Sequence, residues 1–422
     1  MARLQSTVTV RMYNVGFGDA FVVTVRRGRA VWRMLVDCGV HNQGQARPIR
    51  ESVQAIIADL TADSANGEPH LDVVVATHHH ADHISGFALS DWEQVTVGEV
   101  WLPFVEDADD PDAVALRSKQ AATARQLLGM IERRTLGVDP GQWPAAVAAA
   151  RSFALNSFGN ADATDRLVGR NGQRFKNDHT VRYLPSLDEV KNKIEIGVDG
   201  VTIHALGPSR DPKDLKVMDP PASVGWLQLN LDEPIDGSVA ASPYPLFDQV
   251  YALRDHSRVR PDLQEAAKSL QLDKLSNDIG LLGAASILER AVNNTSLFLV
   301  LDVAGTHFLF PGDAQYGAWQ HVLNDPRKKA LLADAAFYKI GHHGSHNATP
   351  KAFVEEVWHD GAAAMLPWGL VKRWEDTIPK KELMAALADH KHTVIRADTR
   401  ANKRVGITTK DDLWRELTFK LK

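Results

Sequence analysis

The segment His78-His79-His80-Ala81-Asp82-His83 decides how the rest of this chain is interpreted. It follows the apolar run 71–77, whose composition predicts a buried strand. Alternate residues of an extended segment project to one side, so we expect His78, His80 and Asp82 to converge and His83 to turn to the other side. Imidazoles and carboxylates suit zinc, manganese or iron. A histidine-rich surface loop is the less favoured alternative, because these ionisable side chains follow a mostly apolar strand.

Two distant segments place the same kinds of side chain at the ends of predicted strands. One is Phe308-Leu309-Phe310-Pro311-Gly312-Asp313, and the other is Tyr338-Lys339-Ile340-Gly341-His342-His343-Gly344-Ser345. Sites in α/β sheets lie at the carboxyl ends of the strands. A Gly-Asp pair alone is more often a turn, and a histidine pair alone is more often a surface feature. Their occurrence together with the first cluster predicts a metal site.

Strand and helix patterns alternate around these segments. The sequence predicts strands within 7–37 and at 71–77, 97–102, 194–206, 296–303, 306–310, 337–340, 364–367 and 393–397, with a helix at 47–62. The ranges 105–195 and 209–290 are mainly helical in pattern, with helices at 112–136, near 144–155 and from 261 to 291. We therefore expect one α/β domain over 1–422, interrupted by two mainly helical insertions.

Composition excludes several classes of protein. The formal net charge is −5, so no global field draws the chain to nucleic acid, although a local basic groove stays open. Cys38 is the only cysteine, which excludes an intrachain disulfide, and it is expected to be a core residue rather than a nucleophile. Without a signal-peptide core or a run of about 18 apolar residues, the chain is expected to be cytoplasmic and to have no membrane partner.

The ordered motifs resemble those of the metallo-β-lactamase superfamily, and more closely the hydrolase domain of competence-type DNA-uptake proteins. Besides the three segments above, the resemblance rests on Asn14-Val15-Gly16-Phe17-Gly18-Asp19-Ala20, Val36-Asp37-Cys38-Gly39 and Asn293-Asn294-Thr295-Ser296-Leu297. It covers roughly 7–104, 195–208 and 292–400. The resemblance implies a four-layered αββα fold, with the helical insertions added to it.

Two departures from the family pattern concern metal ligands. The DNA-uptake domains usually have aspartate where this chain has His80. The superfamily's third histidine has no clear counterpart. Asn294 stands in about the right place, before the strand 296–303, and His204 is an alternative, although its place within a strand favours a core role. This ligand stays open.

The resemblance implies two divalent metal ions, zinc first and manganese as the alternative. His78 and His80 would hold one ion, whereas Asp82, His83 and either His342 or His343 would hold the other, with Asp313 bridging the two. A water between the ions would lose a proton and attack the substrate as hydroxide. Asp82 and His83 are the expected catalytic residues.

Side chains beside these ligands have expected supporting roles. Lys339 and Ser345 flank the last histidines and could contact a phosphate, as could Asn294 if it is not a ligand. Asp19 and Asp37 are expected behind the ligands, where they would hold the histidines in one tautomer.

The resemblance favours phosphodiester hydrolysis, by a nuclease acting on nucleic acid or by a nucleotide phosphodiesterase. Hydrolysis of a carboxylic ester, lactone or amide is the first alternative, and a metal-binding regulatory module without catalysis is the second. The helical insertions are expected to set substrate access, or else to form a homodimer or partner surface.

Overall fold

The computed structural model describes residues 5–421 except 159, 222–223, 227–277, 373–374, 376, 401–405 and 411. Most of the helical region expected at 261–291 therefore lies outside the described residues. The chain divides into two compact units. One comprises Met1–Val114, Asn160–Gln228 and Ala291–Lys422, and the other comprises Ala115–Gly159 and Leu229–Arg290.

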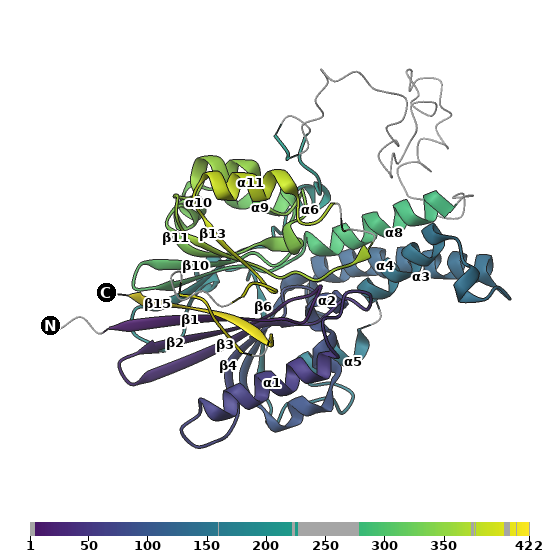
Figure 1. The fold of residues 1–422 in the computed structure, drawn as a ribbon. Helices are drawn as coiled ribbons and strands as arrows, with labels where there is room; N and C mark the ends of the chain where they lie inside the picture. Colours follow the sequence, from purple (N-terminus) through teal and green to yellow (C-terminus); the bar gives the residue numbers. More distant parts are fainter. Residues whose placement is uncertain are drawn as a thin grey trace. The chain divides into compact units, whose positions relative to one another are not determined.

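The first unit is built on two β-sheets (Figure 1). In the described ranges, the eight-stranded sheet has the order β14 (Thr408–Lys410), β15 (Trp414–Leu421), β1 (Ser6–Tyr13), β2 (Ala20–Arg27), β3 (Ala30–Cys38), β4 (His70–Val75), β5 (Thr96–Pro103) and β6 (Thr180–Leu184). The seven-stranded sheet has the order β13 (Thr393–Arg396), β12 (Ala363–Leu366), β11 (Ala335–Lys339), β10 (Thr306–Phe310), β9 (Phe298–Val303), β8 (Val201–Gly207) and β7 (Lys193–Glu195).

Apolar side chains form three layers around these sheets. The middle layer lies between the sheets, and it takes alternate residues of β1 (Val8, Val10 and Met12) together with Leu299 of β9 and Phe310 of β10. The outer face of the first sheet is covered by α1 (Ile49–Ala62). The outer face of the second is covered by α9 (Tyr316–Leu323), α10 (Pro326–Ala333) and α11 (Lys381–Asp389) (Figure 1). This is the predicted αββα order of layers, because each sheet buries both faces.

The remaining helices are shorter or belong to the second unit. In the first unit lie α2 (Ala81–Ile84), α5 (Ala161–Val168) and α6 (Pro212–Lys216). The described part of the second unit comprises most of α3 (Pro111–Thr135), α4 (Ala145–Phe158) and most of α8 (Asp278–Asn293). No helix in the described ranges combines the length and the apolar composition needed to cross a bilayer.

The structure differs from the sequence patterns in its strands. The range 105–195 is helical only in part, because β6 pairs in parallel with β5 and β7 pairs with β8. The single predicted run 194–206 is a hairpin of β7 and β8. The C-terminal strand β15, which the patterns did not identify, pairs with β1 over Ser6–Tyr13. Each of these strands is short or polar on one face. Its sequence pattern alone is therefore too weak to predict a strand, and the strand is identified by its pairing partner.

Candidate metal centre

The predicted ligands gather at one edge of the two sheets. The segment with His78, His80, Asp82 and His83 follows β4, and Asp313 follows β10. Two histidines follow β11, which is parallel to β10. Asp37 lies at the end of β3, which is parallel to β4, and Asp19 directly precedes β2. The sheet topology therefore brings together side chains that are up to about three hundred residues apart in the sequence.

The loop after β4 supplies four buried side chains, of which the most exposed, Asp82, has 5% of its surface accessible. His78 Nε2 lies 3.0 Å from His80 Nδ1. The expectation that His83 turns away from Asp82 is wrong. The extended segment ends at His80 and helix α2 begins at Ala81, so Asp82 and His83 lie in a helical turn and face the same cluster.

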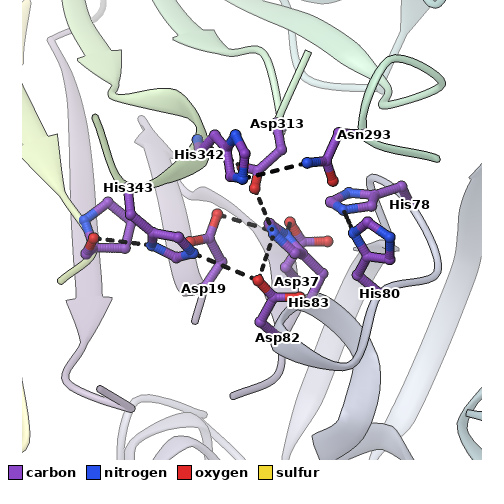
Figure 2. A network of polar contacts seen from close by, with 12 residues as sticks. Asp19, Asp37, His78, His80, Asp82, His83, Asn293, Asp313, His342 and His343 are labelled. Carbon is purple, nitrogen blue, oxygen red and sulfur yellow. Dashed lines mark hydrogen bonds and ion pairs between the residues drawn. The ribbon is translucent and has the colours of Figure 1, made fainter. Parts of the chain in front are cut away.

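Four side chains from three segments could hold one metal ion. Asp82, His83, Asp313 and His343 each offer a ligand atom, and these atoms all lie within 4.8 Å of one another. His83 Nε2 lies 3.1 Å from Asp313 Oδ2, and His343 Nε2 lies 3.5 Å from Asp82 Oδ2 (Figure 2). The two imidazoles and two carboxylates are ligands that zinc and manganese accept.

The structure separates His343 from His342. His343 faces Asp82, whereas His342 Nε2 lies 3.3 Å from Asn293 Nδ2. Both histidines have left-handed backbones, with φ of 52° for His343 and 45° for His342. Such conformations cost about 1–3 kcal/mol per residue and persist where the surroundings enforce them. The turn Gly341–Gly344 thereby directs two consecutive imidazoles toward different partners.

Asp37 orients His83 from behind. Its carboxylate accepts hydrogen bonds from the Thr77 backbone N–H at 2.7 Å and from the Thr77 hydroxyl at 2.8 Å, and Oδ2 lies 2.8 Å from His83 Nδ1. This contact turns His83 Nε2 toward Asp313. Gly39 permits the close packing, because a Cβ there would lie 2.3 Å from the Ala81 carbonyl oxygen.

Asp37→Asn is expected to weaken metal binding by about 10–100-fold, because an amide supports the orienting contact to His83 less well than a carboxylate does. Isothermal titration with zinc measures the effect. Asp360→Asn, which alters an exposed carboxylate paired with His390, is the matched control. Unchanged zinc affinity in Asp37→Asn would show that the contact between Asp37 and His83 does not affect metal binding by His83.

Lys339 lies inside the cluster. Its ammonium group lies 2.5 Å from Asp19 Oδ2 and 3.0 Å from Asp313 Oδ1, and only 2% of its side chain is accessible. Asp313 Oδ1 also accepts the backbone N–H of His342 at 2.8 Å. Oδ1 is therefore occupied twice, which leaves Oδ2 facing His83. Lys339 holds Asp313 in this orientation, a role that the sequence patterns did not predict.

Asn294 has no group left for a substrate. Its amide nitrogen donates to the carbonyl oxygens of Asp214, Leu215 and Val217, and its oxygen accepts the backbone N–H groups of Gln315 and Ala318. Asn294 thus ties α6 to α9, and these contacts do not support the role in substrate binding that was expected from the sequence.

Ser345 and His204 contact residues other than the predicted ligands. The Ser345 hydroxyl donates to Asn347 Oδ1 at 3.1 Å, so its observed contact is within its own loop. His204 lies within β8, where it is opposite Lys193 of β7 and Val300 of β9.

Three supporting residues were not identified from the sequence patterns. The Thr77 hydroxyl lies 3.1 Å from His78 Nδ1 and also contacts Asp37. The Ser296 hydroxyl lies 3.2 Å from His78 Nδ1 and accepts the backbone N–H of Asp313 at 3.1 Å. Asn293 approaches His342. The motif Asn293-Asn294-Thr295-Ser296 contained two of them, but only tertiary structure shows which of its polar side chains face the cluster.

Burial and neighbouring charges shift the pKa values of these side chains in directions that favour binding of a cation. Burial, together with His83 and His80, holds the pKa of His78 well below its usual range, and burial lowers the pKa of His80 to about 3. Both rings are neutral at pH 7, the form that can bind a metal. Burial opposes a charge on His83, but the surrounding carboxylates, chiefly Asp313, outweigh it and raise its pKa. His343 Nε2 is buried and lies 3.5 Å from Asp82 Oδ2, which is longer than a normal hydrogen bond. These properties fit a divalent ion at the cluster.

Zinc binding is expected to release a proton from His83, because its raised pKa keeps the ring protonated at neutral pH. As pH falls, protons compete better with zinc for His83, so the apparent affinity for zinc should drop by about tenfold per pH unit for one displaced proton. Calorimetry in buffers of different ionisation enthalpy counts the protons. A pH-independent affinity without proton release would contradict this assignment.

Part of the chain matches a family of known proteins, and this match agrees with the two-sheet fold and with the cluster of metal-type side chains. Residues 13–110 match the family model described as the metallo-beta-lactamase superfamily. This range includes Asp19, Asp37 and the segment His78–His83, but the match does not distinguish among subfamilies. A search of curated proteins found no matching sequence. Members of this superfamily are generally hydrolytic enzymes that bind divalent metals. The α/β unit therefore has the metallo-β-lactamase fold, with a domain of that superfamily matched at residues 13–110 and a His/Asp cluster suited to metal.

Proposed function

We propose that this protein is a metal-dependent phosphodiesterase, acting on nucleic acid or on nucleotides. The observation that carries the proposal is the group Asp82, His83, Asp313 and His343 beside the buried ammonium of Lys339. The two carboxylates and two imidazoles suit a hydrolytic metal centre. Lys339 adds a positive charge that favours an anionic substrate.

The charge balance at this cluster allows an anionic substrate. The buried carboxylates Asp19, Asp37, Asp82 and Asp313 and the ammonium of Lys339 together carry three negative charges. Two divalent ions and one hydroxide would balance these charges, so the centre would not repel a phosphodiester anion.

The chain's own residues hold and orient this centre. His78 and His80 offer neutral imidazoles, His83 is directed by Asp37, and Lys339 turns Asp313. Divalent ions, zinc or manganese, would supply Lewis-acid chemistry, polarising the substrate and activating water. The preorganised carboxylates keep the ligand positions from rearranging during the reaction.

A substrate panel tests the proposal. The full chain, loaded with zinc or manganese, is expected to hydrolyse bis(p-nitrophenyl) phosphate and linear DNA faster than p-nitrophenyl acetate or a lactone. Preference for the carboxylic esters would favour the alternative hydrolase. Full metal occupancy without turnover of any of these substrates would favour a regulatory module.

We also propose that the helices α3, α4 and α8 form a surface that governs substrate access or binds a second copy of the chain. Their separation into a compact unit supports the proposal. Light scattering after size-exclusion chromatography measures the mass of the wild type and of a variant in which a short linker replaces 115–159. A monomeric wild type would exclude the homodimer.

A further inference from the structure

The two halves of the candidate centre are unequally supplied with protein ligands. One half has Asp82, His83, His343 and Asp313, which form a complete four-ligand group. The other half has the His78 and His80 rings, with their facing nitrogens 3.0 Å apart, and the family resemblance implies that it shares Asp313 with the first. A third ligand of its own is therefore needed if this half is to hold an ion as firmly.

The two residues expected from the sequence do not supply this ligand. Asn294 uses its amide on backbone groups of α6 and α9, and His204 lies within β8, opposite Lys193 of β7 and Val300 of β9. A different residue of the same segment remains. The hydroxyl of Ser296 contacts His78 Nδ1 at 3.2 Å, so the stretch 293–296 reaches the His78 side of the cluster.

Asn293 has the properties of the missing ligand. Only 1% of it is accessible, and its buried side-chain oxygen makes no hydrogen bond. Its amide nitrogen lies 3.3 Å from His342 Nε2, and Figure 2 shows Asn293 and His342 turned toward the cluster that contains His78 and His80. An unsatisfied buried oxygen costs about 1–3 kcal/mol, so such an atom at a cluster of metal-type side chains indicates a partner.

We propose that the Asn293 side-chain oxygen is the third protein ligand of the His78–His80 half. An amide oxygen is a harder ligand than the imidazole it would replace, so this half should bind zinc less tightly and accept manganese comparatively well. The centre then binds one ion tightly at the four-ligand group and a second ion more weakly. The inference rests on the proposed metal centre but not on the identity of the substrate.

Metal titration of the full-length apo-protein tests the assignment. Calorimetry with zinc and with manganese should resolve two steps, the second at least about tenfold weaker. Asn293→Ala should weaken the second step by a further tenfold or more and leave the first in place. Asn293→His should strengthen the second step for zinc, and Asn293→Asp should retain it. Asn347→Ala, which removes another buried asparagine amide bonded to Ser345 and Asp219, is the control and should leave both steps unchanged.

The outcomes separate this assignment from the proposed function. Two unchanged steps in Asn293→Ala would overturn the assignment, even if the protein hydrolyses phosphodiesters. Two steps that respond to Asn293 as expected, without phosphodiester hydrolysis, would contradict only the function. If Asn293→Ala fails to fold, the nearly isosteric Asn293→Asp decides, because loss of the second step in this folded variant would also overturn the assignment.

Discussion

Asp82→Ala and His83→Ala are each expected to lower hydrolysis by about 10³-fold or more. Both side chains belong to the four-ligand group, and the catalytic effect of a bound divalent ion amounts to several kcal/mol, where each 1.4 kcal/mol is about tenfold in rate. His83 should show the larger loss, because it also links the carboxylates of Asp37 and Asp313. Initial rates with a phosphodiester, at saturating zinc or manganese, measure the effect.

The fold should survive both substitutions, because the cluster lies at the strand ends rather than in the apolar layer between the sheets. Circular dichroism and the unfolding midpoint of the apo-proteins check this. His359→Ala is the matched control, since this exposed histidine pairs with Asp334 in the way that buried histidines of the cluster pair with aspartates. Turnover at the wild-type rate by either ligand variant would contradict the assignment.

Removal of metal is expected to abolish hydrolysis and to lower the unfolding midpoint. The purified protein should contain close to two divalent ions per chain after reconstitution, measured by plasma mass spectrometry. An ion at a hundred times its dissociation constant stabilises the native state by about 2.7 kcal/mol, which corresponds to roughly 4 °C for a unit of about three hundred residues. Removing the ion also leaves Asp82 and Asp313 buried near each other without its compensating charge.

Chelation followed by dialysis, with the unfolding midpoint and the rate measured in parallel, tests this expectation. Adding back zinc or manganese should restore both quantities, whereas calcium should restore neither, because imidazole-containing sites suit transition metals. Asp82→Ala is the control, since its midpoint should respond less to chelation. Only trace metal after reconstitution, or full activity in chelator, would overturn the metal assignment.

Much of the fold could be predicted from local patterns. Strand β1 alternates apolar and polar residues, and α1 places Val53, Ile56, Ile57 and Leu60 on one face, so their buried sides follow from the sequence. Strands β6 and β15 could not be placed in this way. Their stability comes from pairing with β5 and β1, and β1 is about four hundred residues distant from β15. Such partners are set by the topology of the whole unit.

The sequence by itself determined the types of the candidate metal-binding side chains, their order along the chain and their position after apolar strands, as for Asp313 after β10. Only the tertiary structure decided which side chains meet. Left-handed backbones send His342 and His343 to different partners, and backbone groups of α6 and α9 occupy Asn294 while the oxygen of Asn293 stays unpaired. The physical reason is that a side chain's direction depends on its backbone conformation and on groups brought by distant segments, and neither can be inferred from residue identity and spacing alone.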